Sequence, residues 1–255
     1  MLFGEIAYGP IHSRRLGISL GVELMPLEHK LCTFNCVYCE CGWNIPVSHP
    51  KLPTRTEVRE ALERKLQALQ TEGVKLDVIT FSGNGEPTLH PDFLGIIEDT
   101  CVLRDRFCPS AKVSVLSNST QLGRPDVVQA LRRCDNRILK LDAATDTMMR
   151  RIDLPVNEHL TVAQLIEWLQ QFDGDFTLQT CFLKGEHNGV ILDNTRDEEL
   201  IAWYEAVDIL HPKQIMIYVI DRKTPEEHLE KIPRERMEAI AAPLRAKGFD
   251  VSISA

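Results

Sequence analysis

The sequence contains no apolar run close to the ~20 residues that a helix needs to cross a bilayer. The segment Gln214–Ile220 is typical of its longest apolar runs. The start MLFGEIAYGP also has no charged region followed by an apolar stretch, so we expect no secretory signal. These two absences predict a cytoplasmic protein without a membrane partner, in a reducing compartment where disulfides are rare.

Repeats, low-complexity segments and long Gly/Ser linkers are also lacking, as is any concentration of basic residues. The 255 residues include 29 Lys and Arg against 37 Asp and Glu, a formal net charge of −8. Domains that bind nucleic acid mainly through phosphates tend to be basic. The composition therefore argues against a large RNA-binding surface, although a local basic patch is compatible with it.

Three of the eight cysteines lie close together, at Cys32, Cys36 and Cys39, with the spacing C-x3-C-x2-C. In a cytosolic enzyme such a group indicates a metal site or catalysis. The other cysteines outside this region are widely spaced, and small buried apolar side chains are the simpler interpretation for them. They are Cys101, Cys108, Cys134 and Cys181.

Two kinds of metal site fit this spacing. Three thiolates hold three irons of a cubane [4Fe–4S] cluster and leave the fourth iron open, whereas closed clusters use four cysteines. A structural zinc site has two pairs of ligands, and no second pair follows here. Cys41 is close enough in sequence to complete a closed four-thiolate site, so a zinc or electron-transfer protein remains an alternative.

The cysteine spacing, with Tyr38 just before the last cysteine, resembles the signature of the radical S-adenosylmethionine (radical SAM) superfamily. The resemblance implies that Cys32, Cys36 and Cys39 bind a [4Fe–4S] cluster whose open iron chelates SAM. It also implies reductive cleavage of SAM to a 5′-deoxyadenosyl radical that abstracts hydrogen. The protein's share of such chemistry is to position the cofactor and to exclude side reactions.

Short β-rich runs alternate with longer helical patterns, which is typical of a parallel sheet built from βα units. A capping box at Thr54-Arg-Thr-Glu57 predicts the start of the first helix. Its apolar face would carry Val58, Leu62, Leu66 and Leu69, and Gly73 would end it. We expect further helices over Asp92–Arg106, Pro125–Arg133, Leu160–Phe172, Arg196–Leu210 and Pro233–Lys247. We expect strands over Ser19–Leu24, Asp77–Phe81, Lys112–Leu116, Arg137–Leu141, Phe176–Phe182, Gln214–Ile220 and Asp250–Ser254.

Six βα units are too few for a closed eight-unit barrel. The fold class expected is therefore α/β, an open partial (β/α)6 barrel of the radical SAM type. We expect a single domain over residues 1–255, with a core at about 16–220, an N-terminal strap at 1–15 and a C-terminal helix and strand at 233–255. In such barrels the active site lies in the loops that follow the strands.

The loop after the strand at Asp77–Phe81 reads S-G-N-G-E-P-T-L. Glycines let the main chain approach a ligand closely, and a carboxylate accepts hydrogen bonds from an ammonium group. The loop resembles the "GGE" element of the family, which implies that Gly83, Asn84, Gly85 and Glu86 bind the methionine amino group of SAM. The simpler alternative is a tight turn, in which the same residue types are common.

The next two strands end in Ser117-Asn118-Ser119-Thr120 and in Lys140-Leu141-Asp142-Ala143. Ser117 and Asn118 are candidates for ribose or carboxylate contacts, although the family pattern expected here, S-N-G-T, has glycine where this chain has Ser119. Lys140 and Asp142 share one side of a strand and are candidate cofactor or substrate contacts. A helix N-cap is the alternative role for Asp142.

Further segments resemble the radical SAM proteins related to the wyosine-base enzymes of tRNA. They are K-L-D-A itself, R-I-D-L-P at 151–155 and G-P-x-x-S-R-R-L-G at 9–17. The resemblance adds Tyr218, and less strongly Gln179, as candidate adenine or substrate contacts. Arg14, Arg15 and Arg222 are candidate contacts for anionic groups of a substrate.

No cysteine precedes Cys32, whereas the wyosine-forming relatives carry upstream cysteines for a second cluster. We therefore expect a radical SAM enzyme that acts on a small molecule, peptide or protein, with an electron donor such as flavodoxin or ferredoxin. A tRNA-modifying radical SAM enzyme is the second hypothesis. The sequence does not identify the substrate, and it does not show whether SAM is consumed or regenerated.

Overall fold

The computed structural model describes residues 2–13 and 15–254, so the candidate Arg14 lies outside the described residues. The chain divides into two compact units, which are described here one at a time. The first comprises Met1–Cys32, Asn44–Ser117 and Gln121–Arg137, and the second comprises Thr33–Trp43, Asn118–Thr120 and Ile138–Ala255.

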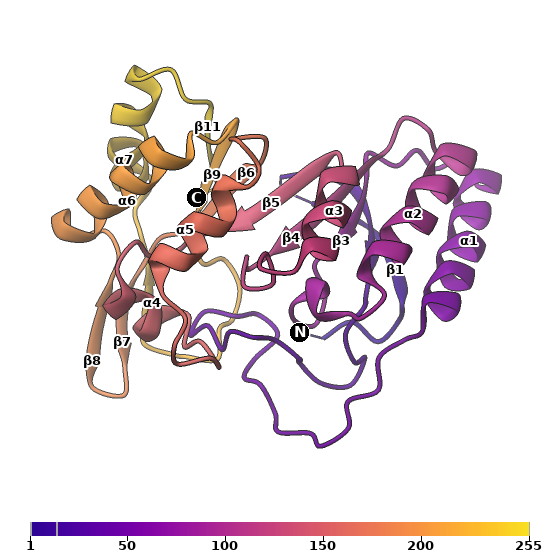
Figure 1. The fold of residues 1–255 in the computed structure, drawn as a ribbon, viewed down its shortest axis with the longest axis horizontal. Helices are drawn as coiled ribbons and strands as arrows, with labels where there is room; N and C mark the ends of the chain where they lie inside the picture. Colours follow the sequence, from indigo (N-terminus) through magenta and orange to yellow (C-terminus); the bar gives the residue numbers. More distant parts are fainter. Residues whose placement is uncertain (1, 14, 255) are drawn as a thin grey trace. The chain divides into compact units, whose positions relative to one another are not determined.

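The first unit is a sheet covered by helices. Its strands are β1 (Ala7–Ser13), β2 (Gly17–Val22), β3 (Val78–Phe81) and β4 (Lys112–Ser117), hydrogen-bonded in that order. β1 is antiparallel to β2, whereas β2, β3 and β4 are parallel. Its helices are α1 (Arg55–Thr71), α2 (Phe93–Phe107) and α3 (Pro125–Arg133), with a short 3₁₀ helix, η1 (Pro87–Leu89). α2 packs between α1 and α3 (Figure 1).

Helix α1 confirms the start and stop signals of the sequence. The Thr54 side chain accepts a hydrogen bond from the backbone N–H of Glu57, and the Glu57 carboxylate accepts one from the backbone N–H of Thr54. The four apolar residues of the expected face, Val58, Leu62, Leu66 and Leu69, are the buried ones. Gly73 follows the helix with a positive φ of 69°, a conformation that favours glycine.

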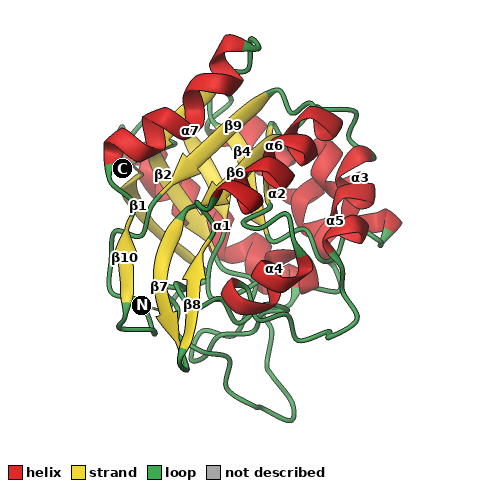
Figure 2. Ribbon diagram, turned by 90° about the vertical axis from the view of Figure 1, so that its left-hand side faces the viewer, coloured by secondary structure: helices red, strands yellow, loops and turns green. Residues whose placement is uncertain are grey.

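The second unit contains a parallel sheet and a smaller antiparallel one. Strands β5 (Asn136–Lys140), β6 (Thr177–Cys181), β9 (Gln214–Tyr218) and β11 (Val251–Ser254) form the parallel sheet in that order. The helices are α4 (Asp146–Ile152), α5 (Val162–Gln170), α6 (Asp197–Leu210) and α7 (Arg234–Ala246). In the smaller sheet, β7 (Leu183–His187) lies between β10 (Leu229–Lys231) and β8 (Val190–Asp193), as Figure 2 shows.

All seven expected strands and six expected helices are present, with ends within two residues of those expected. The antiparallel sheet, helix α4 and β1 were not expected. The β7–β8 hairpin had a signal: Asn188-Gly189 separates two β-rich runs, and both residues have positive φ, 51° and 76°. That combination is typical of a type I′ hairpin turn. Among the described helices, none is long and apolar enough to span a bilayer.

Glu23, which follows β2, carries a buried carboxyl group. The residue is 1% exposed, and its carboxylate accepts hydrogen bonds from the backbone N–H groups of Met25, at 2.7 Å, and Asn84, at 2.5 Å. Burial raises the pKa of Glu23 from 4.5 to about 7, and the backbone hydrogen bonds only partly oppose this. The carboxyl group therefore takes up a proton more readily in the folded than in the unfolded protein.

A raised folded-state pKa makes stability fall as pH rises from 4.5 to about 7. At 1.36 kcal/mol per pKa unit, we expect Glu23 to account for a loss of about 3 kcal/mol in the free energy of unfolding across this range. Urea unfolding at several pH values should show a smaller fall in stability for Glu23→Gln than for the wild type, with the difference equal to this loss. Glu72→Gln, at an exposed position, should show the same fall as the wild type. Equal slopes for the wild type and Glu23→Gln would contradict the expectation.

Candidate active site

The cysteine loop, Thr33–Trp43, belongs to the second unit, whereas Cys32 is the last residue of a segment of the first unit. Cys36 is buried, and Cys32, Cys39 and Cys41 are partly exposed. Two successive turns shape the loop, because the N–H of Cys39 donates to the carbonyl of Cys36 and the N–H of Gly42 donates to that of Cys39. Within the described residues, no two cysteines form a disulfide.

The cysteine loop pairs with residues 152–156, the segment that contains most of the R-I-D-L-P motif. Three backbone hydrogen bonds of 2.9 Å join them: Asn35 N–H to the Asp153 carbonyl, Val37 N–H to the Ile152 carbonyl, and Val156 N–H to the Thr33 carbonyl. Ile152 and Asp153 form the C-terminal end of α4. The motif thus has a structural role, which is to hold the backbone on both sides of Cys36.

A buried cluster of charges lies beside Cys36. The Nζ atom of Lys140, the last residue of β5, is 2.9 Å from the Cys36 Sγ and forms ion pairs with Asp153, at 2.6 Å, and Asp142, at 3.1 Å. It also lies 5.1 Å from the centre of the Tyr38 ring. The three charged side chains are 10% exposed or less, so the cation compensates both the carboxylates and the sulfur in a dry environment.

Asp142 joins this cluster to two tyrosines. Its Oδ2 accepts a hydrogen bond from the Tyr38 hydroxyl, and its Oδ1 accepts one from the backbone N–H of Cys181 at 2.8 Å. The hydroxyl of Tyr218, at the end of β9, donates to the Tyr38 hydroxyl at 3.4 Å. Asp142 is therefore held by contacts from three parts of the second unit and does not cap a helix, because α4 begins after Thr145.

Burial and neighbouring charges shift the pKa values of the side chains in this group of charges. Burial, reinforced by the Asp142 charge, raises the pKa of Tyr38 well above its usual value, so the phenol keeps its proton. Burial alone would lower the pKa of Lys140, but the charges of Asp142, Asp153 and Cys36 together raise it well above its usual value. Burial also raises the pKa of Asp153 to about 6, against the opposing effect of Lys140.

The S-N-S-T turn is held by hydrogen bonds within the second unit. The Asn118 amide donates to the Thr33 hydroxyl at 2.8 Å, and its carbonyl oxygen accepts from the N–H and the hydroxyl of Thr120. Ser119 has the left-handed φ, 70°, that the family's glycine would adopt, and its buried hydroxyl donates to the Lys140 carbonyl at 3.1 Å. The departure from the family pattern therefore preserves the turn.

Ser119 combines a strained backbone with a compensating hydrogen bond, which predicts that two substitutions differ in their effect on stability. Ser119→Ala keeps the strain and loses the bond, so we expect it to lower the free energy of unfolding by about 1–2 kcal/mol. Ser119→Gly loses the same bond but relieves about 1 kcal/mol of left-handed strain, so its stability should lie close to that of the wild type. Urea unfolding of both variants tests this expectation. A Ser119→Gly variant less stable than Ser119→Ala would contradict it.

The G-N-G-E loop belongs to the first unit. Atoms packed against its two glycines leave no space for a side chain at either position. A Cβ atom on Gly85, whose φ is 150°, would lie 1.8 Å from the Leu31 carbonyl oxygen, and one on Gly83 would meet the Glu23 carboxylate. Leu31 and Gly85 form a parallel β-bridge next to Cys32. The loop thus fixes the backbone that leads into the first cysteine.

Glu86 and Ser117 are brought together in the first unit. The buried Glu86 Oε1 accepts hydrogen bonds from the Ser117 hydroxyl, at 2.9 Å, and from the N–H and hydroxyl of Thr88. The Asn84 side chain is fully buried, and its amide bonds to the carbonyls of Phe3 and Pro26. Asn84 therefore anchors the N-terminal segment, a role that sequence reasoning missed.

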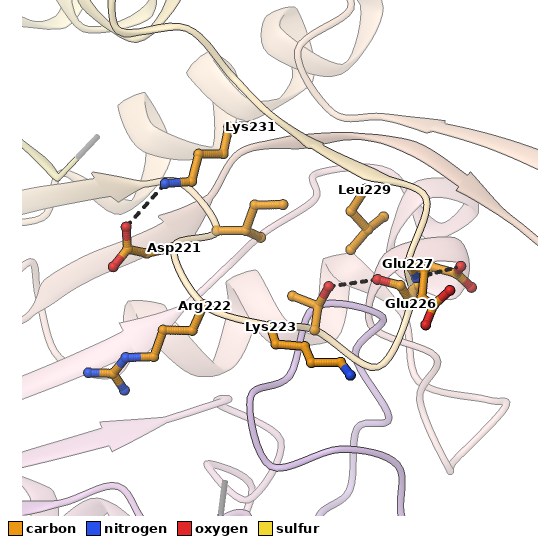
Figure 3. Close-up of a pocket in the computed structure, with 9 residues that line it drawn as sticks. Asp221, Arg222, Lys223, Glu226, Glu227, Leu229 and Lys231 are labelled. Carbon is orange, nitrogen blue, oxygen red and sulfur yellow. Dashed lines mark hydrogen bonds and ion pairs between the residues drawn. The ribbon is translucent and has the colours of Figure 1, made fainter.

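The remaining candidates are Gln179, within β6 of the second unit, and two exposed arginines. Gln179 pairs with Lys140 between β6 and β5. Arg222 is an exposed residue whose guanidinium pairs with Glu40 at 2.7 Å. It lines a pocket of about 380 Å³ formed by residues 220–231, in which charges of both signs lie close together (Figure 3). Arg15 is exposed on the first unit.

Asp153 is the main site residue that sequence reasoning missed. Its motif was noticed only as a family resemblance, and no periodicity or spacing connects it to Cys36. Sequence reasoning did identify five residues that the structure gathers in the second unit: Cys36, Tyr38, Lys140, Asp142 and Tyr218.

Three cysteines at the spacing C-x3-C-x2-C are a donor set that fits a [4Fe–4S] cluster. In the described part of the chain, no group of three His, Cys, Asp or Glu side chains is placed to hold one metal ion. A cubane cluster instead takes one thiolate per iron. The Lys140 ammonium group lies 2.9 Å from the Cys36 sulfur and donates a hydrogen bond to it.

Comparison with known families decides between these interpretations, because the model of the radical SAM superfamily matches residues 29–197. The chain belongs to the radical SAM superfamily. Membership implies SAM and an iron–sulfur cluster in general terms, and it confirms the expected family. The matched span contains the cysteine loop and every candidate cofactor residue except Tyr218.

Two similar sequences belong to the UPF0026 family. A UPF0026 protein of Helicobacter pylori strain 26695 is 32% identical over 222 residues, which are 86% of this chain and 66% of that protein. The UPF0026 protein slr1464 of Synechocystis is 32% identical over 226 residues, covering 86% of this chain and 76% of that protein. The chain thus spans about two thirds to three quarters of the length of these relatives.

Solved structures confirm the fold class. A radical SAM methyltransferase from Sphaerobacter thermophilus is similar with a TM-score of 0.63 and 15% identity, over 92% of this chain and 65% of that one. A structure of TYW1 with a lysine–pyruvate adduct bound has a TM-score of 0.60 and 16% identity, over 89% and 73% of the two chains. The α/β partial barrel of the radical SAM type, expected from the sequence, is therefore confirmed, and TYW1 is similar to the chain in fold.

Proposed function

We propose that the protein is a radical SAM enzyme in which Cys32, Cys36 and Cys39 hold a [4Fe–4S] cluster. The observation that carries the proposal is the C-x3-C-x2-C motif within a chain of this family, with the Cys36 sulfur buried beside a cation. When bound, the cluster supplies the electron that cleaves SAM to a 5′-deoxyadenosyl radical, which abstracts hydrogen from the substrate.

The chain's own residues would bind and orient the cofactors. The backbone of residues 152–156 fixes the cysteine loop, so Cys36 is presented in one conformation. We assign the SAM amino group to the G-N-G-E loop, where Glu86 supplies a buried carboxylate. Ser117, Asn118, Gln179 and Tyr218 are proposed to contact the rest of SAM. Tyr38, Lys140 and Asp142 exclude water from the sulfur of Cys36 by filling the space around it.

We propose a small molecule, peptide or protein as the substrate. The net charge of −8 supports this class over tRNA. The structurally similar SuiB of Streptococcus suis has been solved bound to its precursor peptide SuiA, with a TM-score of 0.65, 14% identity and coverage of 92% and 48% of the two chains. We propose flavodoxin or ferredoxin as the electron donor.

A tRNA substrate is the second candidate, favoured by the likeness to TYW1. The two candidates separate in a filter-binding assay with unmodified tRNA at increasing salt. Retention that falls steeply with salt would support tRNA, because phosphate contacts depend on salt concentration. No retention at low salt would support the first candidate.

The test of the proposed function needs no substrate. The protein is reconstituted anaerobically with iron and sulfide, reduced, and examined by EPR with and without SAM. We expect a reduced-cluster signal that changes when SAM is added, because one iron lacks a protein ligand. A signal indifferent to SAM, or one bound zinc and no cluster, would overturn the proposal.

A further inference from the structure

The ammonium group of Lys140 has a specific arrangement of acceptors. Its Nζ donates a hydrogen bond to the Cys36 Sγ at 2.9 Å and forms ion pairs with Asp153, at 2.6 Å, and Asp142, at 3.1 Å. The rings of Phe34 and Tyr38, 5.0 and 5.1 Å away, cover it further. The charge is therefore fixed in place and largely shielded from solvent.

The two carboxylates would already compensate a buried lysine, so the contact with sulfur needs a separate explanation. We infer that Lys140 raises the reduction potential of the cluster bound through Cys36, and that Asp153 opposes this effect. This inference rests on the proposed function. It adds that Lys140 and Asp153 adjust the reduction potential of the cluster through Cys36, one of its proposed ligands.

The physical reason is the charge on the ligand sulfur. Hydrogen bonds to the sulfurs and the net charge around an iron–sulfur cluster set its reduction potential. One-electron reduction adds negative charge, which a cation at 2.9 Å from Sγ stabilises. Asp153 has the opposite effect on the reduction potential, because its carboxylate offsets part of the Lys140 charge.

Asp153 also has a position suited to this role. Its carbonyl accepts the Asn35 N–H in the cysteine loop, while its side chain is 3% exposed and faces Lys140. The backbone that holds the cysteine loop thus places a carboxylate against the cation that contacts Cys36. Asp142 is less suitable as a probe, because it also accepts hydrogen bonds from Tyr38 and Cys181.

The experiment is an anaerobic EPR-monitored redox titration, with dithionite and mediators, of the reconstituted wild type and three variants. Lys140→Gln should lower the potential by at least 59 mV, a tenfold change in the one-electron equilibrium constant. Asp153→Asn should raise it. Lys213→Gln, at an exposed lysine paired with Asp175 on the same unit, should leave it unchanged.

Shifts of opposite sign are the decisive result, because a general loosening of the site would move both potentials in one direction. Equal potentials for the wild type and both variants, or shifts in the same direction, would overturn the inference. If Lys140→Gln fails to load a cluster, the direction of the Asp153→Asn shift decides. A wild-type cluster that ignores SAM would instead count against the proposed function, so the two failures are distinguishable.

Discussion

Replacing Cys36 with alanine is expected to abolish the SAM-responsive cluster while the protein remains folded. The substitution removes one of the three proposed ligand thiolates and leaves Lys140 facing a methyl group, with Asp142 and Asp153 still paired to it. We expect reconstituted Cys36→Ala to give no EPR signal that responds to SAM. The yield of 5′-deoxyadenosine should fall to the background without enzyme. Circular dichroism should show wild-type secondary structure.

Two other cysteines provide controls for this result. Cys134 is buried in the first unit, where its thiol donates to the Ala130 carbonyl, and Cys134→Ala should keep the cluster. Cys41→Ala tests the alternative of four thiolates, because it should also keep the cluster if Cys32, Cys36 and Cys39 are sufficient. Continued production of 5′-deoxyadenosine by Cys36→Ala would remove Cys36 from the ligand set.

Gly85→Ala is expected to be among the most destabilising single substitutions outside the cysteine loop. Its Cβ would lie 1.8 Å from the carbonyl oxygen of Leu31, and the neighbour that must move is backbone. The φ of 150° adds strain for any residue with a side chain. We expect the free energy of unfolding to fall by about 3 kcal/mol or more, measured by urea denaturation.

Gly73→Ala is the matched control, because Gly73 also has a positive φ but a Cβ added to it would meet no atom within 4 Å. Gly73→Ala should lower the free energy of unfolding by only about 1 kcal/mol, which is the strain of a left-handed backbone. The difference between the two variants isolates the close approach of Gly85 to Leu31. A loss equal to that of Gly73→Ala would show that this approach adds nothing to stability.

The parts of the fold that the sequence predicted are those determined by local patterns. The capping box at Thr54 and the apolar spacing from Val58 to Leu69 depend on residues within one helix, and the structure confirms them. The parallel strands are short β-rich runs, and every residue of β3 and of β6 is buried, which is typical of strands covered on both faces. Strand β1 lacks this pattern, because Gly9-Pro10 interrupts it where its register with β2 shifts.

The residues of the candidate site also divide into those that local patterns predicted and those that they did not. Lys140 and Asp142 were found because both stand at the end of a predicted strand, where alternation places them on one side. Asp153 follows α4 and forms an ion pair with Lys140, the last residue of β5. The Asn84 side chain bonds to Phe3, 81 positions away. Such contacts depend on how elements pack in three dimensions, and no short-range pattern encodes them.

The pairing of Val37 with Ile152 joins residues 115 positions apart, which has a consequence for biosynthesis. The cysteines leave the ribosome early, but the segment that orders their loop is made later, roughly 6–23 seconds afterwards at 5–20 residues per second. During that interval the nascent thiols have no fixed arrangement. Iron and sulfide delivered then would meet a flexible loop, so we expect cluster assembly to follow synthesis of residue 156.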